Sequence, residues 1–208
     1  MFSIFHMKLI IPCFLKTYKD LVIYLLMYYS FLLFLSVVGC VISKEYKAVD
    51  YVNVDQYLGR WHQVYSDKFN NLFQKNGRCS TADYGLLENK NISVLNKQFD
   101  QDGKIDSISG VAFYKEGDCC GYLTVELKDL SPAPYWIIEL GPVVNDYYEY
   151  SIVSDDKALT LFVLCRNVTD FFNKYNDIVL KSLKELGFTK PWNSPKPMDQ
   201  TNCDESYF

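Results

Sequence analysis

The chain contains the stretch LTVELK at residues 123–128, in which apolar and polar residues alternate one by one. Successive side chains of a β-strand point to opposite faces, so this pattern predicts a strand with one enclosed face and one wet face. We expect Leu123, Val125 and Leu127 to face the interior, and Thr124 and Glu126 to face outward.

Similar short strands are expected on both sides of this stretch. They lie at residues 80–84, 92–96, 108–114, 135–140, 147–153 and 159–165. Turn residues separate them: Asn89-Lys90-Asn91, Asp102-Gly103, and the two prolines Pro132 and Pro134. About eight strands between Tyr57 and Arg166, with no helix between them, predict an antiparallel sandwich or barrel.

One amphipathic helix is expected at about residues 170–186, with Thr169 or Asp170 as its N-cap and Gly187 after its last residue. Its apolar side chains recur three or four positions apart, at Phe171, Tyr175, Ile178, Val179, Leu183 and Leu186. We expect this stripe to cover the outside of the sheet, although a helix that lies on a membrane or binds a partner would have the same pattern. Leu161, Val163 and Cys165 would then pack under the helix, which turns Phe162 and Leu164 inward.

The first 43 residues differ from the rest. Lysines precede residues 21–43, a run of 23 residues without charge. This pattern predicts a secretory signal peptide, or an uncleaved signal anchor that attaches the protein to a membrane. Val37-Val38-Gly39-Cys40 also resembles a bacterial lipobox. Each alternative places residues 44–208 outside the cytosol, and the sequons at Asn91 and Asn167 are candidate glycosylation sites.

Charge and residue counts exclude several functions. The formal net charge is −4, which gives no electrostatic basis for binding nucleic acid. His62 is the single histidine in residues 44–208, so a histidine-based zinc site is excluded and we expect no metal or cofactor. Five cysteines remain in this part of the chain, and an oxidising compartment makes disulfides the default.

Three motifs occur in order along the expected strands. Residues 57–61 hold a Gly59-x-Trp61 pair, residues 145–150 read NDYYEY with Asp146 and Tyr147, and Arg166 ends the last strand. The chain resembles the lipocalin family in these motifs, and in particular the branch that holds apolipoprotein D and bacterial lipocalins. The resemblance implies an eight-stranded antiparallel up-and-down β-barrel at about residues 57–166, one helix on its outside, and an extended tail at residues 188–208.

The resemblance also implies roles for individual residues. Trp61 would plug one end of the barrel with Arg166 stacked on its indole, Gly59 would allow close approach of the N-terminal segment, and Cys79 would pair with Cys203. Ligand-binding positions would be Tyr84, Asn96, Leu127, Tyr135, Phe162 and Leu164. To these we add Val125, which strand alternation turns inward. The chain departs from these relatives at residues 141–144, which look inserted, at Asp155, which replaces a cysteine, and at Cys119-Cys120, which has no counterpart.

The function that the resemblance implies is the binding and carrying of a small hydrophobic molecule, such as a fatty acid, lysolipid, sterol-like compound or tetrapyrrole. The alternatives are a lipocalin-fold enzyme acting on a lipid and a protein that handles haem. We expect no enzyme activity, because Cys79 is committed to a disulfide, Cys119 and Cys120 lie in a loop, and Cys165 faces out. His62 follows Trp61 and so points away from the interior. Ligand identity and oligomer formation are left open.

Overall fold

The computed structural model describes residues 22–23, 26–28, 46–68, 77–117 and 119–203. The chain divides into two compact units, Met1–Lys44 and Glu45–Phe208. In the first unit, residues 22–23 and 26–28 are helical, and the rest of the expected leader, with Cys40, lies outside the described residues. Among the residues described, no helix is both long and apolar enough to span a membrane.

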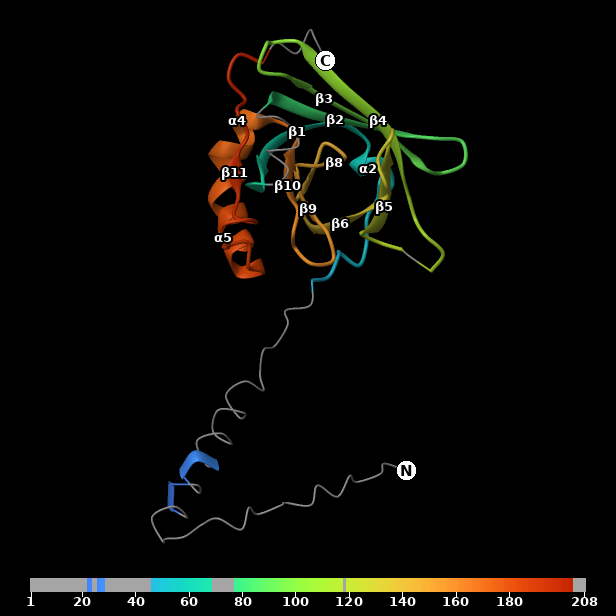
Figure 1. Ribbon diagram of the computed structural model, residues 1–208. Helices are drawn as coiled ribbons and strands as arrows, with labels where there is room; N and C mark the ends of the chain where they lie inside the picture. Colours follow the sequence, from blue (N-terminus) through green and yellow to red (C-terminus); the bar gives the residue numbers. More distant parts are fainter. Residues whose placement is uncertain (1–21, 24–25, 29–45, 69–76, 118, 204–208) are drawn as a thin grey trace. The chain divides into compact units, whose positions relative to one another are not determined.

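Eight strands of the second unit wind into a closed antiparallel barrel (Figure 1). They are β1 (Gly59–Ser66), β2 (Arg78–Leu86), β3 (Ile92–Phe99), β4 (Ile105–Phe113), β5 (Tyr122–Leu127), β6 (Ala133–Leu140), β9 (Tyr150–Ser154) and β10 (Leu161–Cys165). Each strand pairs with the next, and β10 also pairs with β1, which closes the ring. A ninth strand, β11 (Lys196–Pro197), pairs with the end of β1. The prediction of an eight-stranded barrel is confirmed.

The chain enters the barrel through a short helix, α2 (Val54–Tyr57), rather than through a strand that begins at Tyr57. The Asn53 side chain caps this helix by accepting a hydrogen bond from the Asp55 N–H at 3.1 Å. Gly59 then adopts a φ of +91°, a conformation that disfavours residues with a Cβ, and β1 starts there. β1 therefore begins two residues after Tyr57, where the expected barrel region begins.

Other strand boundaries differ from the expected ones as well. β4 starts at Ile105 rather than Ile108, because its first residues extend a hairpin in which Ile105 pairs with Phe99. β6 starts at Ala133 and includes Pro134, which sits near the first residue of a strand where a missing N–H is tolerated. β10 starts at Leu161, because residues 155–160 form the turn before it.

The strand expected at residues 147–153 is interrupted. Asn145 and Asp146 both have positive φ, at 49° and 67°, which is the conformation of a tight hairpin turn. This turn joins two short strands, β7 (Val143–Val144) and β8 (Tyr147–Tyr148), into a separate hairpin. The segment 141–144, which looks inserted in the sequence, supplies one strand of it, and β9 begins only at Tyr150.

The helix on the outside of the barrel runs from Val168 to Leu186 in three parts, α4 (Val168–Asp170), a π-helical turn (Phe171–Tyr175) and α5 (Asn176–Leu186). Its N-cap is Asn167, whose side chain accepts from the Asp170 N–H at 2.9 Å, and not Thr169 or Asp170. The π-helical turn adds one residue to the helical repeat, which shifts the buried face. Val179 and Leu183 are therefore buried, whereas Ile178 is 58% exposed and does not belong to the stripe. Gly187 ends the helix with a φ of +92°, as expected.

Two apolar clusters lie on opposite faces of the barrel wall. The interior cluster includes Trp61, Leu123 and Leu164, with Val125, Leu127 and Phe162 packed against it. The exterior cluster joins Leu161, Val163 and Cys165 to residues of the helix. The alternation expected for β5 and β10 is thus confirmed, with one difference. Thr124 is only 3% exposed, because Phe113 and Pro134 flank it on the neighbouring strands.

A disulfide fixes the tail to the barrel, as the family resemblance implies. It joins Cys79 on β2 to Cys203, 124 residues further along the chain. The same tail segment donates a hydrogen bond from the Met198 N–H to the Val64 carbonyl and another from the Gln200 amide to the Gln63 carbonyl. The tail is therefore held against β1 and β2 at several points.

Asp155 organises the turn between β9 and β10. Its buried carboxylate accepts four hydrogen bonds, from the N–H groups of Lys157, Leu159 and Thr160 and from the Thr160 hydroxyl, at 2.8–3.1 Å. The family resemblance implies a cysteine at this position. Here the carboxylate satisfies the turn's backbone donors directly.

We expect Asp155→Ala to lower the free energy of unfolding by about 2 kcal/mol, because it leaves three backbone N–H groups and one hydroxyl of the turn without their acceptor. Chemical denaturation of both proteins would measure the difference. Asp156→Ala is the matched control, since Asp156 is exposed, and its expected effect is within about 0.5 kcal/mol. Equal losses in the two variants would contradict the role given to Asp155.

Candidate ligand-binding pocket

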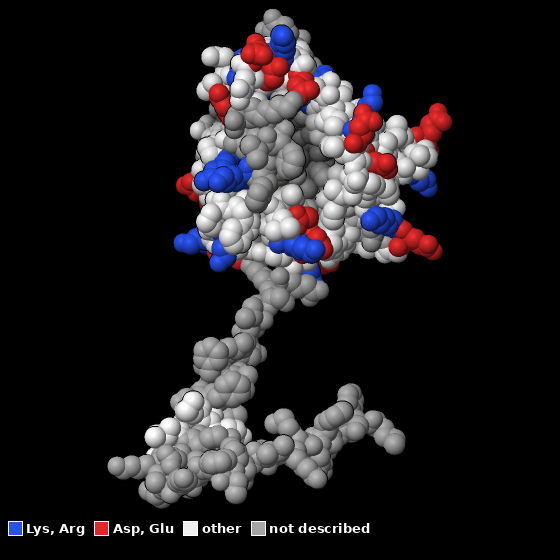
Figure 2. Space-filling view, viewed as in Figure 1, with Lys and Arg blue, Asp and Glu red and all other residues white. Residues whose placement is uncertain are grey.

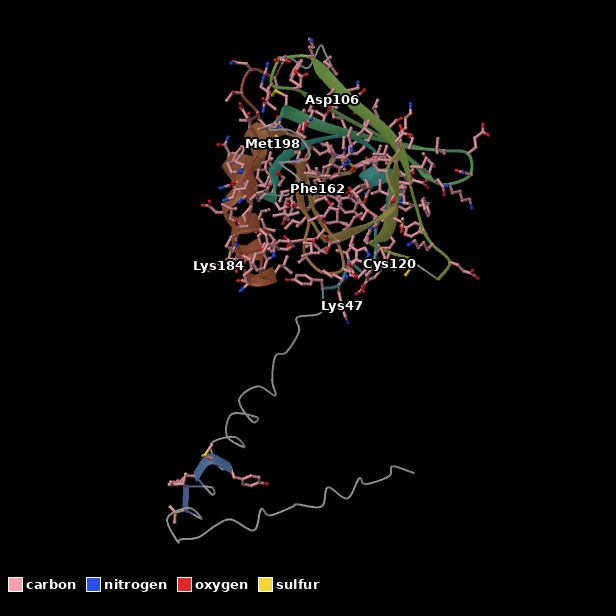
Figure 3. All side chains as sticks on the ribbon, viewed as in Figure 1. Lys47, Asp106, Cys120, Phe162, Lys184 and Met198 are labelled. Carbon is pink, nitrogen blue, oxygen red and sulfur yellow. A yellow bond between two sulfur atoms is a disulfide. The ribbon has the colours of Figure 1, made fainter. Side chains whose placement is uncertain are left out.

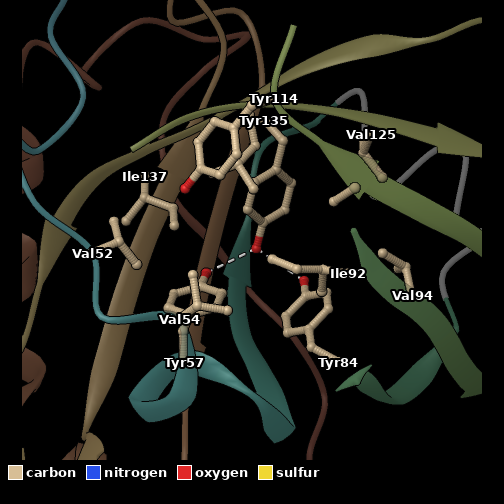
Figure 4. A pocket seen from close by; sticks show the side chains of 12 residues that line it. Val52, Val54, Tyr57, Tyr84, Ile92, Val94, Tyr114, Val125, Tyr135 and Ile137 are labelled. Atoms are coloured by element: carbon tan, nitrogen blue, oxygen red, sulfur yellow. Dashed lines mark hydrogen bonds between the residues drawn. The ribbon is translucent and has the colours of Figure 1, made fainter. Parts of the chain in front are cut away.

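A pocket lies inside the barrel, between the strands and the segment that enters it (Figure 4). Twelve residues line it: Val52, Val54, Tyr57, Tyr84, Ile92, Val94, Ala112, Tyr114, Leu123, Val125, Tyr135 and Ile137. Aliphatic and aromatic side chains make up this set. The enclosed free space is about 20 Å³, which is room for one water molecule.

Four buried hydroxyl groups form a chain of hydrogen bonds in this apolar surrounding. The Tyr57 hydroxyl lies 3.1 Å from the Ser151 hydroxyl and 2.8 Å from the Tyr135 hydroxyl, which in turn lies 2.9 Å from the Tyr84 hydroxyl (Figure 4). Each hydroxyl carries one hydrogen, and three bonds use three of the four hydrogens. One hydrogen is therefore left to be donated outside this chain of hydroxyls.

The three phenols stay neutral at physiological pH. Burial raises the pKa of Tyr57 from 10.0 to about 12, and hydrogen bonds from Ser151 and Tyr135 oppose part of this rise. Burial also raises the pKa of Tyr84 and of Tyr135, and the proximity of the other phenols adds to the effect. The pocket thus presents neutral hydroxyls and not phenolates.

This rise predicts a loss of stability at high pH. An unfolded tyrosine loses its proton near pH 10, whereas folded Tyr57 holds its proton to about pH 12. The stabilisation is complete below pH 10 and is lost as the pH rises through 12. Unfolding by denaturant at a series of pH values would show the decline, and Tyr57→Phe should make it shallower. Tyr51→Phe, at a 70% exposed position, should leave the slope unchanged. A slope unaffected by Tyr57→Phe would refute the assignment.

The residues expected to bind ligand lie on one continuous interior surface. Tyr84, Val125 and Tyr135 line the pocket, and Leu127, Phe162 and Leu164 belong to the same interior cluster without lining it. Asn96 is two positions from inward-facing Val94, so its side chain lies on the same face of β3. Its Oδ1 atom is buried and has no hydrogen-bond partner among the described residues. The binding role of these residues stays a prediction.

Several pocket residues were not expected from the sequence. Val52 and Val54 lie before the first strand, where strand alternation does not apply. Tyr114 directly follows the last residue of β4, although the expected strand at residues 108–114 included it. Tyr57 belongs to the first motif and has two roles. Its carbonyl accepts hydrogen bonds from Trp61 and Arg166, and its hydroxyl lies in the pocket. Ser151 is a buried polar residue on β9 whose partner no local pattern reveals.

Arg166 closes the end of the barrel next to Trp61. Its guanidinium lies 3.8 Å from the centre of the Trp61 ring and 5.1 Å from that of Tyr147. Its nitrogens donate at 2.7–3.2 Å to the carbonyl groups of Gln56, Tyr57, Leu58, Arg60 and Tyr148. Burial lowers the pKa of Arg166. The five carbonyl acceptors and the two aromatic faces stabilise the charged guanidinium in this buried position. Asp146, in contrast, is an exposed turn residue.

The other candidate reactive groups lie away from the interior. His62 follows inward-facing Trp61 and pairs with Cys165, which belongs to the exterior cluster. Cys119 and Cys120 lie in the loop after β4.

Acidic and basic side chains are interspersed on the face shown in Figure 2.

A closed eight-stranded barrel with an interior pocket and a stacked Trp–Arg pair at one end is the architecture of a lipocalin. The model of the lipocalin-like domain matches residues 52–192, and the chain belongs to this family. It is similar to apolipoprotein D of Mus musculus, with 38% identity over 102 residues, which are 49% of this chain and 50% of the relative. The chain thus spans about half the length of the apolipoprotein D sequences it matches.

Two further similarities extend over more of the chain. Temperature-induced lipocalin-1 of Arabidopsis thaliana is 28% identical over 153 residues, which cover 69% of this chain and 78% of the relative. The structure of insecticyanin from the tobacco hornworm Manduca sexta superimposes with a TM-score of 0.56 at 17% identity, over 76% of this chain and 86% of that one. The structural similarity supports the fold.

Proposed function

We propose that this lipocalin encloses and carries one small, neutral, hydrophobic molecule in its barrel. The observation that carries the proposal is that the apolar interior holds one acceptor without a donor and one hydroxyl hydrogen without an acceptor. The Asn96 Oδ1 atom is a buried acceptor without a donor, and the hydroxyl chain through Tyr135 holds one hydrogen more than it uses. Buried polar groups are rarely left without partners, so a bound molecule with a hydroxyl group, which can both donate and accept a hydrogen bond, suits this interior.

The same interior disfavours an anionic ligand. No Lys or Arg is among the pocket residues, and Arg166, behind Trp61, already donates to five carbonyl groups. A carboxylate buried here would have no counter-ion, which is costly. Of the classes that the sequence leaves open, a sterol-like alcohol therefore fits better than a fatty acid.

Binding requires the pocket to widen. Ligand pockets hold roughly 300–1,000 Å³, whereas the space enclosed here is about 20 Å³. The Tyr135 side chain lies between Tyr57 and Tyr84 and fills the middle of the pocket (Figure 4). A ligand would displace this side chain and take over hydrogen bonds that the phenols make with one another.

Retinol and retinoate test this proposal, because they share one apolar skeleton and differ in charge at one end. We expect retinol to bind saturably, with one molecule per chain, and about tenfold more tightly than retinoate, which corresponds to 1.4 kcal/mol. Fluorescence titration at pH 8 would measure both. Saturable binding of retinoate alone would contradict the neutral-ligand assignment, and no saturable binding of either probe would contradict the carrier function.

Asn96→Leu tests the unpaired amide in the same titration. The substitution keeps the size of the side chain and removes its acceptor, so retinol should bind about tenfold more weakly. Asn173→Leu, at an exposed position of the helix, is the matched control and should leave the affinity unchanged.

We also propose that residues 44–208 act outside the cytosol, after a signal peptide or on a signal anchor formed by residues 1–43. The Cys79–Cys203 disulfide supports an oxidising compartment. Asn167 is exposed, and its side-chain oxygen serves the helix cap, which leaves its nitrogen available for a glycan. Asn91 is half-buried at the start of β3 and is the less accessible of the two sequons.

A further inference from the structure

Cys119 and Cys120 lie side by side in the loop between β4 and β5. The two sulfur atoms are 2.6 Å apart, Cys119 is exposed and Cys120 is half-buried. In Figure 3, Cys120 lies at the outer edge of the barrel, whereas Phe162 lies within the ring of strands. Neither thiol takes part in the pocket or in the Cys79–Cys203 disulfide.

The backbone around this pair is held firmly on its buried side. The Tyr122 N–H donates to the Cys119 carbonyl and closes a tight turn, in which Cys120 has a φ of +66°. The Tyr114 hydroxyl donates to the Cys120 carbonyl at 2.9 Å. Gly121 donates to Val49 and accepts from Ile137, both at 2.9 Å, and a Cβ on Gly121 would lie 2.6 Å from the Ile137 carbonyl oxygen. The turn thus holds an exposed Cys119 and a half-buried Cys120 on a backbone fixed by these hydrogen bonds.

We propose that Cys119 and Cys120 are a dithiol–disulfide redox site that reacts with small-molecule disulfides of the glutathione type. The exposed Cys119 attacks first, forms a mixed disulfide and releases one small thiol. Cys120 then attacks the Cys119 sulfur, a bond forms between the two neighbouring side chains, and the second small thiol leaves. The two protein thiols are oxidised, the small disulfide is reduced to two thiols, and the two protons pass to the released thiols.

The electrostatics of the pair agree with this order of attack. The contact with Cys119 raises the pKa of Cys120, which disfavours Cys120 as the first attacking thiolate. Tyr114, which holds the Cys120 carbonyl, also lines the interior pocket. The redox site itself does not depend on the proposed ligand binding.

The full chain can be tested directly, because the tryptic peptide 116–128 (EGDCCGYLTVELK) holds both cysteines and no other. The protein is equilibrated with mixtures of reduced and oxidised glutathione, treated with N-ethylmaleimide while folded, and digested. We expect the peptide to carry two labels in reducing mixtures. In oxidising mixtures we expect an unlabelled peptide whose mass is two hydrogen atoms below that of the unlabelled dithiol form. Cys165 is 0% exposed and should be labelled only after denaturation, which controls for unfolding.

Three results would overturn the proposal: two labels under oxidising conditions, a glutathione adduct that persists on either cysteine, or a disulfide between two chains. Tyr114→Phe tests the held turn. Without the Tyr114 hydroxyl the Cys120 carbonyl is no longer fixed. The equilibrium constant for forming the disulfide between Cys119 and Cys120 should therefore fall about threefold or more. An unchanged constant would contradict the part given to Tyr114.

Discussion

Replacing Arg166 with alanine is expected to lower the free energy of unfolding by about 4 kcal/mol. The guanidinium donates to five carbonyl groups and lies between the rings of Trp61 and Tyr147. Its removal takes one hydrogen-bond donor from each of these carbonyls and exposes the indole that closes the barrel. Equilibrium unfolding in urea would measure the loss.

Arg60→Ala is the control for this experiment, because Arg60 is the adjacent arginine on β1 and pairs with Asp83 through a half-exposed salt bridge. Such pairs contribute little, so its expected effect is at most about 1 kcal/mol. Arg166→Lys should recover only part of the stability, since an ammonium group has fewer donors and no planar face for Trp61. A loss for Arg166→Ala no larger than that for Arg60→Ala would show that the closed end does not depend on this cation.

Phe162→Asp is expected to abolish retinol binding. Phe162 faces the interior from β10 and packs against the cluster that contains Tyr84 and Leu164. A carboxylate at this position would lie in an apolar interior beside the bound molecule, without a counter-ion. Fluorescence titration would show no saturable signal.

Phe172→Asp is the matched control, because it makes the same change from phenylalanine to aspartate outside the barrel. Phe172 lies on the outer helix, is 43% exposed, and contacts Phe171 and Tyr65 outside the barrel. Its substitution should leave the affinity for retinol unchanged. Because Phe162→Asp also risks destabilising the fold, Phe162→Ala is the second variant, with an expected loss of about tenfold in affinity. Normal binding by Phe162→Ala would remove Phe162 from the binding surface.

Alternation along strands made much of the interior predictable. Leu123, Val125 and Leu127 face inward on β5, and Phe162 and Leu164 do so on β10, because a strand has a period of two wherever its hydrogen-bond register is regular. The helix was less predictable. One extra residue in the π-helical turn rotates Ile178 to the surface, and no pattern in the sequence of that segment indicates a π-helical turn.

The polar details of the site depend on contacts between distant segments. Tyr57 meets Ser151 across 94 positions and Tyr135 across 78, so no local motif indicates the hydroxyl chain. The same holds for Asp155, whose value as an acceptor appears only once the β9–β10 turn has formed. The roles of Trp61 and Arg166 were predictable, because they are carried by residue type and position together. For Gly59 the structure shows a different reason from the expected close approach: its φ is +91°, and a Cβ there would meet Arg166 Nη1 only at an ordinary contact distance of 3.5 Å.

Native mass spectrometry of the full-length protein, purified from its own source, tests the carrier function most directly. The same spectrum would report the first residue of the mature chain and any glycan at Asn91 or Asn167. We expect each chain to release one small, uncharged, hydrophobic molecule on activation in the gas phase. A bare protein mass, together with the absence of saturable binding of retinol and retinoate, would contradict the account.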